Sequence, residues 1–336
     1  MRVFIVVCLV SLLFFSCNSD KAPDVSDINI SLTTERFEKK LFDTTATSFT
    51  NYLQQLQNSD PGFTNIFVYQ VLSADPKWPA DSTAAYVNMF VKSFHPVFKD
   101  AEKIYSDFSK YENGIKKVMQ YVKYYFPGYK VPGKIITFIG PPDGDGDGIS
   151  NDAIIVALNY HLGKDNPLYK TSIVQTTYPD YITMTFEPDY IPINIAKQAL
   201  NDIYPQKESD KPLVNQMVEN GKRLYILSKF LPATPDHKLI GYTEQQMKDC
   251  NKGEDRIWDM FVKSGLLQSL DKNLMKRYIE DGPKTDELGE GAPGNIGSYA
   301  GWQIVKKYMQ KNPALTLDQL IKLDEETIFQ EAKYKP

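Results

Sequence analysis

Apolar residues recur at every third or fourth position along two long parts of the chain, residues 36–126 and 193–310. This spacing places them on one face of a helix, so both parts are predicted to be mainly helical. Helices are expected within residues 36–43, 48–57, 84–108, 114–126, 193–204, 213–231, 244–267 and 300–310.

Between these helical parts the pattern changes to short β-branched and aromatic runs bounded by Gly, Pro and Asp. Residues 134–140, 153–159 and 181–186 are therefore predicted to be strands. The strands do not alternate one for one with helices, which favours an α+β fold, mostly helical with a small mixed sheet.

The first seventeen residues have the layout of a bacterial signal peptide. Arg2 supplies a positive charge, an apolar run follows, and Cys17 stands where the cut is expected. A cysteine at the cut indicates a lipoprotein whose Cys17 thiol is acylated. The apolar run of about 13 residues is shorter than the roughly 20 that a membrane span needs. We therefore predict a membrane anchor at Cys17 and three parts: a signal peptide (1–17), a flexible tether (18–30) and one domain (31–336).

Composition and charge narrow the class of partner. The formal net charge is -4, and loss of Arg2 with the signal peptide makes it more negative, so no nucleic-acid partner is expected. A hydrophobic content of 42% is enough for a sizeable core. Cys8 leaves with the signal peptide and Cys17 carries lipid, so Cys250 is predicted to be a lone thiol without a catalytic role.

Alternating aspartates in residues 143–152 form the sharpest local motif. Oxygen ligands at alternate positions, followed by Gly148, are typical of a loop that wraps a calcium ion. The twelfth position of an EF-hand loop holds Ile154 here, where a bidentate glutamate is needed. The loop is either a structural calcium site or a solvated turn of a hairpin between strands 134–140 and 153–159. The candidate ligands are Asp143, Asp145, Asp147, Asn151 and Asp152.

No local motif of a known enzyme class is present. His95, His161 and His237 lie far apart and none belongs to H-E-x-x-H, so each is predicted to be a packed or surface histidine. The chain also lacks a G-x-S-x-G elbow, a P-loop and a dinucleotide fingerprint.

A loop rich in glycine and proline, within residues 282–309, leads into an amphipathic helix expected to begin near Ser298 or Tyr299. Loops of this length in a compact domain usually carry function. Positive φ or close backbone approach is expected at Gly289, Gly291, Gly294, Gly297 and Gly301. Core positions are predicted for Trp302, Ile304, Val305 and Tyr308.

Several stretches, in the same order along the chain, resemble the gliding motility lipoproteins GldB of the Bacteroidetes. They are the lipoprotein signal ending at Cys17 and residues 153–169, 213–232, 239–247 and 282–309. The resemblance implies a role in the envelope machinery for surface gliding, tied to type IX protein secretion, with other proteins of that machinery as partners. Residues 18–21 lack the clustered acidic signal for surface display, so we expect an outer-membrane anchor facing the periplasm, with the inner membrane as second choice.

The GldB family is in turn similar to predicted zinc peptidases with a zincin-like fold. That similarity implies that Lys197 and Asn201 occupy zinc-binding positions, Gln198 the position of the catalytic glutamate, and Glu219 that of the third ligand. One carboxylate does not hold zinc alone, and an ammonium repels the metal. The expectation is a peptidase scaffold without catalytic residues or cofactor, apart from the possible calcium.

Three functions remain open from the sequence. The first is a non-catalytic interaction module, binding either through a cleft in which strand 153–159 is the free edge for a peptide, or through its outer surface. The second is a metal-dependent hydrolase that uses Glu219 with a remote histidine such as His161. The third is a calcium-dependent binding protein controlled by residues 143–152.

Overall fold

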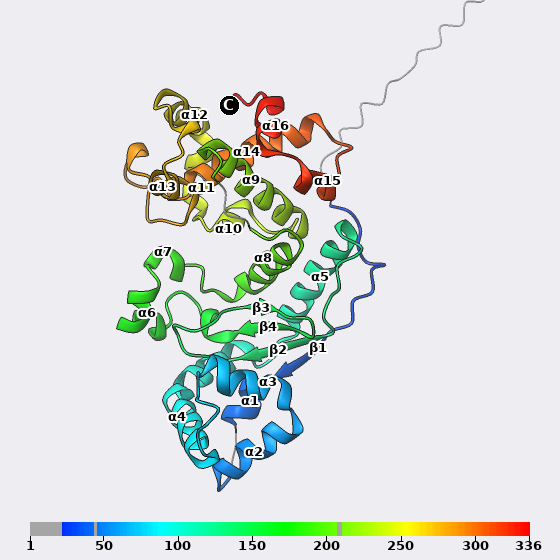
Figure 1. The fold of residues 1–336 in the computed structure, drawn as a ribbon, viewed down its shortest axis with the longest axis vertical. Coiled ribbons are helices and arrows are strands. Elements are labelled where there is room, and N and C mark those ends of the chain that lie inside the picture. Colours follow the sequence, from blue (N-terminus) through cyan, green and yellow to red (C-terminus); the bar gives the residue numbers. More distant parts are fainter. Residues whose placement is uncertain (1–21, 44–45, 207–209) are drawn as a thin grey trace, which may run out of the picture.

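A small sheet lies between two groups of helices in the computed structural model, which describes residues 22–43, 46–206 and 210–336 (Figure 1). On one side are α1 to α4, and on the other are α8 and the C-terminal helices. Cys17 and the rest of the predicted signal peptide lie outside the described residues.

The sheet is mixed and has the strand order β1-β2-β4-β3. Its strands are β1 (Thr33–Arg36), β2 (Lys134–Phe138), β3 (Gly148–Ile149) and β4 (Ala153–Ala157). β1, β2 and β4 run parallel, with Lys134 opposite Ala153, and β3 is antiparallel to β4. The α+β class and the small mixed sheet are therefore confirmed.

The alternative of a hairpin between residues 134–140 and 153–159 is wrong, although both predicted strands exist. β2 and β4 are parallel neighbours, and the chain between them passes outward to form β3 before it returns as β4. The apolar run of β4 is buried along most of its length, which suits an inner parallel strand better than one arm of an exposed hairpin. Since β2 and β3 flank β4, it is not the free edge expected for a peptide.

The predicted strand 181–186 is also wrong, because this stretch contains the short helix α7 (Asp180–Thr183) followed by a turn. The hydroxyls of Thr183 and Thr185 donate to the carbonyl oxygens of Asp180 and Ile182. Such local bonds offer the backbone an alternative to strand pairing.

The N-terminal helices pack an aromatic cluster against the sheet. Phe37 meets Phe63 edge to face at 4.9 Å between ring centroids, and Phe63 meets Phe138 of β2 at 5.6 Å. Helices were predicted over most of this N-terminal part of the chain, and the structure confirms them. Their bounds are α1 (Phe37–Phe42), α2 (Phe49–Ser59), α3 (Pro61–Ile66), α4 (Ala80–Tyr105) and α5 (Ser109–Tyr125).

The helices from α8 onward lie on the opposite side of the sheet from α1 to α4 (Figure 1). A glycine, Gly253, divides the predicted helix 244–267 into α11 and α12. The bounds are α6 (Ser172–Thr177), α8 (Ile191–Ile203), α9 (Leu213–Phe230), α10 (Asp236–Ile240), α11 (Glu244–Lys252), α12 (Glu254–Lys263), α13 (Lys272–Ile279), α14 (Ile296–Lys311), α15 (Leu317–Lys322) and α16 (Glu325–Ala332).

The glycines of the loop before α14 act in the two ways predicted. Gly289 and Gly291 have φ of 91° and 92°, which L side chains rarely adopt. Gly294, Gly297 and Gly301 instead lie so close to other backbone that a Cβ would collide with it. The four predicted core residues of α14 are buried, and the helix begins at Ile296, slightly before the expected start.

The packed part of the chain reaches further towards the N-terminus than residue 31. Val25 and Ile30 are buried, and Gln120 Nε2 donates to the carbonyl oxygen of Ile28 at 2.9 Å. Among the described helices, none has the length and apolar character required to cross a bilayer.

Candidate functional site

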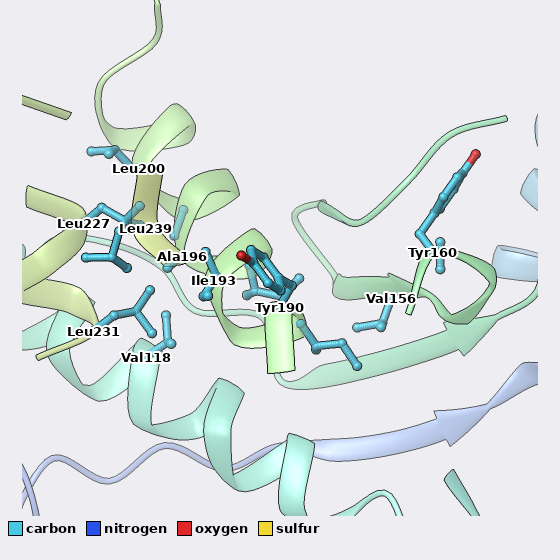
Figure 2. Close-up of a cluster of buried hydrophobic side chains, with 14 of the residues drawn as sticks. Val118, Val156, Tyr160, Tyr190, Ile193, Ala196, Leu200, Leu227, Leu231 and Leu239 are labelled. Carbon is cyan, nitrogen blue, oxygen red and sulfur yellow. The ribbon is translucent and has the colours of Figure 1, made fainter. Parts of the chain in front are cut away.

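Helix α8 presents an apolar face to the core and a polar face to a pocket. Ile193, Ala196 and Leu200 pack among side chains from α5, β4 and α9 (Figure 2). Lys197 and Asn201 are one helical turn apart, so they share the other face. Both line a cavity of about 560 Å³, together with Leu200 at its floor. The structure therefore brings together two of the four positions that the peptidase resemblance implies.

The other two positions lie elsewhere. Gln198 is half-buried on α8 and is not among the residues that line the pocket. Glu219, on α9, also lies outside the lining, and its carboxylate accepts a hydrogen bond from the Tyr204 hydroxyl. It pairs with Lys222 at 3.1 Å rather than with Lys197.

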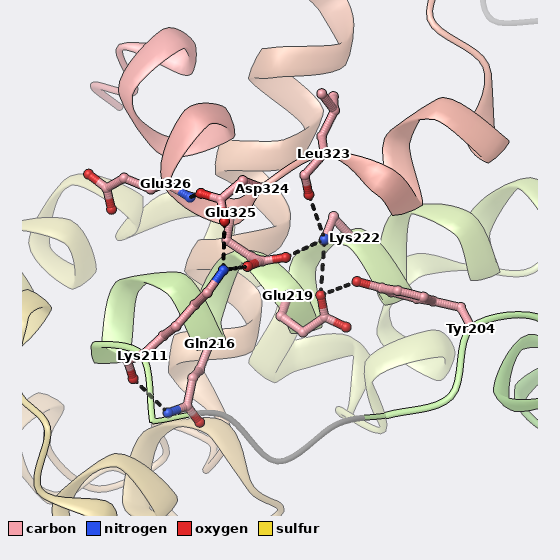
Figure 3. A network of polar contacts seen from close by, with 9 residues as sticks. All are labelled: Tyr204, Lys211, Gln216, Glu219, Lys222, Leu323, Asp324, Glu325 and Glu326. Atoms are coloured by element: carbon pink, nitrogen blue, oxygen red, sulfur yellow. Dashed lines mark hydrogen bonds and ion pairs between the residues drawn. The ribbon is translucent and has the colours of Figure 1, made fainter.

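Lys222 holds the C-terminal helices to α9 (Figure 3). Its side chain is fully buried, and Nζ donates to Glu325 Oε1 at 2.5 Å and to the carbonyl oxygen of Leu323 at 3.2 Å. Burial alone would lower the pKa of Lys222, but the charge of Glu219 and the bond to Glu325 raise it above its usual value. Glu219, to which the peptidase resemblance assigns the position of a zinc ligand, belongs to a structural ion-pair network here.

Lys197 is in the opposite situation. In the described part of the chain, no hydrogen bond or ion pair reaches its Nζ, although the side chain is accessible from the pocket. The surrounding protein displaces water and lowers the pKa of the ammonium, and the charge of Asp281 opposes this shift only in part. The pocket therefore holds a cation that the described protein does not neutralise by direct contact.

Arg223 connects the two walls of the pocket. From α9 its guanidinium donates to Asn201 Oδ1 and, at 2.6 Å, to the carbonyl oxygen of Tyr204 at the end of α8. Burial is the main reason that the pKa of Arg223 is lowered, and the group stays charged because arginine titrates far above neutral pH. These contacts fix the polar face of α8 against α9.

The loop before α14 forms the opposite wall. Asn220 Nδ2 donates to Ser298 Oγ at 2.8 Å and to the carbonyl oxygen of Ile279 at 3.1 Å. Asn295, which has a φ of 57°, donates to Asp281 Oδ1 at 3.1 Å and so holds that carboxylate in place. The glycine-rich loop, predicted to carry function, therefore shapes one side of the pocket.

The aspartate loop does not gather its candidate ligands. Asp143, Asp145, Asn151 and Asp152 are exposed, while Asp147 is turned inward and its side chain is only 2% exposed. Asp147 Oδ2 pairs with His161 Nε2 at 2.7 Å and accepts from Asn194 Nδ2 at 3.0 Å; its Oδ1 accepts from the Ala157 backbone at 2.9 Å. Through these contacts Asp147 joins β4 and α8 to the start of β3.

The side chains present do not match a zinc site. Over the described residues, His, Cys, Asp and Glu form no group of three or more that could hold a metal ion. His161 is fully buried beside Asp147, while Glu219 is bound by Tyr204 and Lys222, so the structure does not bring this histidine and glutamate together. The donors at the peptidase positions are an ammonium and an amide, which zinc does not favour.

The comparison with protein families decides which family the chain belongs to. The model of the family described as gliding motility protein GldB matches residues 18–336, beginning directly after Cys17. This chain is a member of the GldB family. No curated protein and no solved structure matches it significantly. The predicted resemblance to GldB is confirmed, and the chain is a gliding-motility-related protein by family.

Sequence reasoning missed Arg223 and the carboxylate of Asp281 as parts of the site. Arg223 lies one helical turn beyond Glu219, so its position near the α8–α9 contact was open to a periodicity argument. Asp281 offered no such signal, because its place in the pocket depends on Asn295 across a loop.

Proposed function

We propose that this GldB family member is a lipid-anchored envelope protein that supports gliding motility as a non-catalytic interaction module. The pocket beneath the polar face of α8 is its binding site. The observation that carries the proposal is Lys197, a cation that no described group pairs with, at a position where the peptidase resemblance implies a metal ligand. A degenerate zincin-like scaffold that retains a cleft accounts for this arrangement.

A pocket that does not catalyse can still bind. A volume of about 560 Å³ lies within the usual range of ligand pockets, and apolar and polar side chains both line it. We infer that its occupant belongs to the gliding machinery or to the associated type IX secretion machinery.

Blocking the pocket tests this role in cells. Asn201→Trp places a bulky ring on the exposed polar face of α8, and Ser93→Trp places the same ring on an exposed turn of α4 as the control. In cells that lack the native gene, the Ser93 variant should restore spreading on agar and type IX cargo secretion, and the Asn201 variant should not. Equal rescue by both, at equal protein levels on immunoblots, contradicts a role for the pocket.

The non-catalytic part of the proposal has its own test. Plasma mass spectrometry of the purified full-length protein should find zinc well below one equivalent. Near-stoichiometric zinc favours the metal-dependent hydrolase instead, and the calcium content of the same sample decides whether residues 143–152 hold an ion.

The anchor is tested by Cys17→Ser. Acylation of Cys17 would hold the protein on a membrane surface, and we propose the periplasmic face of the outer membrane. The wild type should sediment with outer-membrane fractions and the variant should be released. Sedimentation of the wild type with the inner membrane contradicts this location, and a variant that stays with membranes contradicts anchoring by lipid alone.

A further inference from the structure

The pocket offers a negatively charged group a place beside Lys197. Lys197 lines the pocket with an exposed side chain, and no described group forms an ion pair or a hydrogen bond with its Nζ, so the ammonium can pair with an anion that enters the pocket. Arg223 adds a second positive charge on the same side, although two of its N–H groups already serve Asn201 and Tyr204.

The start of α14 adds to this attraction. Asn295 and Ser298, at the first turn of this 16-residue helix, line the pocket across from α8. The N-terminal end of a helix carries partial positive charge from its aligned peptide dipoles. Lys197, Arg223 and the helix end therefore favour an anion from several directions.

Two carboxylates limit how much charge the anion carries. Glu280 and Asp281 line the same pocket, and Asp281 is held in place by Asn295. A phosphate with nearly two negative charges would be repelled by them, whereas the charge of a single carboxylate is balanced by the ammonium of Lys197 alone.

The rest of the lining suits a peptide end. Leu200, Leu227 and Leu239 continue the apolar cluster of Figure 2 into the pocket floor, where they can receive an apolar side chain. Asn201 accepts from Arg223 through Oδ1, and no described protein group accepts from its Nδ2. That amide faces the same pocket as Lys197 and is placed to donate to a main-chain carbonyl.

We propose, as a refinement that rests on the proposed function, that this pocket receives the carboxyl terminus of a peptide chain. The terminal carboxylate lies beside Lys197 and the last side chain lies on the leucine floor. The partner is a protein or peptide that ends in an apolar residue.

Matched peptides test the inference directly. The probes are N-acetylated tetrapeptides ending in leucine, prepared as free acids and as C-terminal amides, with octanoate as a free carboxylic acid. Binding to the full-length protein in detergent is measured by calorimetry. The free acid should bind at least tenfold more tightly than the amide and more tightly than octanoate.

Substitutions then assign that difference to Lys197. Lys197→Met should abolish the preference for the acid, and Lys197→Arg should keep part of it. Lys92→Met, an equivalent change on an exposed turn of α4, should have no effect.

Each contrary result overturns a defined part of the proposal. Equal binding of acid and amide, or no binding of either, overturns the carboxyl-terminus inference. Octanoate binding as tightly as the peptide acid assigns the pocket to a free carboxylic acid and overturns the peptide part. None of these results decides the role in gliding, which the pocket-blocking experiment tests separately.

Discussion

Two lysines on adjacent helices of this protein have contrasting surroundings. Lys222 is fully buried and has Glu325, Glu219 and the Leu323 carbonyl as partners, while Lys197 faces a pocket without a described partner. The partners raise the pKa of Lys222, whereas the protein around Lys197 lowers the pKa of that lysine and the charge of Asp281 opposes the shift only in part. Among the described residues, counter-ions surround the lysine of the structural ion-pair network and not the lysine of the pocket that we propose as a binding site.

The largest expected effect comes from removing the cation of the structural site. Lys222→Met leaves Glu219 and Glu325 without their shared partner and should lower the free energy of unfolding by about 3 kcal/mol, the cost typical of breaking a buried ion pair. Urea denaturation followed by circular dichroism measures it. A loss below about 1 kcal/mol would mean that Lys222 is no more important to stability than a surface lysine.

Local sequence does not distinguish these two lysines. Both lie in amphipathic helices, and the periodic pattern predicted α8 and α9 correctly. The main counter-ion of Lys222 is 103 residues away, on α16, which the sequence analysis did not predict as a helix. The pairing of a buried charge therefore depends on tertiary contacts that no window of the sequence contains.

The same limit explains the errors in the sheet. The β-branched runs identified β2 and β4, but whether two such runs pair as a hairpin depends on the path between them. Here Asp147 directs that path, because its carboxylate is held by His161 and Asn194 and not by solvent or a hairpin turn. The glycines were easier to predict, since positive φ and close approach restrict a position to glycine whatever the rest of the fold.

Glu219→Gln should lower the free energy of unfolding less than Glu325→Gln does. This difference separates the two counter-ions of Lys222 in the structural ion-pair network. Glu325 is less exposed, at 14% against 22% for Glu219, and it also binds Lys211. We expect a loss of about 1 kcal/mol for Glu219→Gln and more for Glu325→Gln. The reverse order in urea denaturation would place the main counter-ion of Lys222 on α9 itself.

Lys197→Met should be nearly neutral for stability, within about 0.5 kcal/mol of the wild type or slightly more stable. The substitution removes a charge that has no described partner and keeps an apolar stem over the pocket floor. Parallel unfolding curves for Lys197→Met and Lys222→Met make the comparison. Similar losses of unfolding free energy for both variants would contradict the contrast between the two lysines, because they would show that Lys197 also has a structural partner.

The smallest and most diagnostic effect is the sign of the pH dependence. The pKa of Lys222 is raised above 10.5, so its contribution to stability is complete below that pH and is lost only as pH rises through the higher folded value. The pKa of Lys197 is lowered below 10.5, so its charge costs stability at neutral pH, and this cost disappears as pH rises from the folded value towards 10.5. Between pH 7 and 10, the wild type should therefore gain stability relative to Lys197→Met, while its advantage over Lys222→Met stays constant.

Urea denaturation of the three proteins across this range measures both differences. The same trend for both variants would mean that the two lysines have the same electrostatic surroundings. The distinction between the ion-pair network of Lys222 and the pocket of Lys197 would then fail.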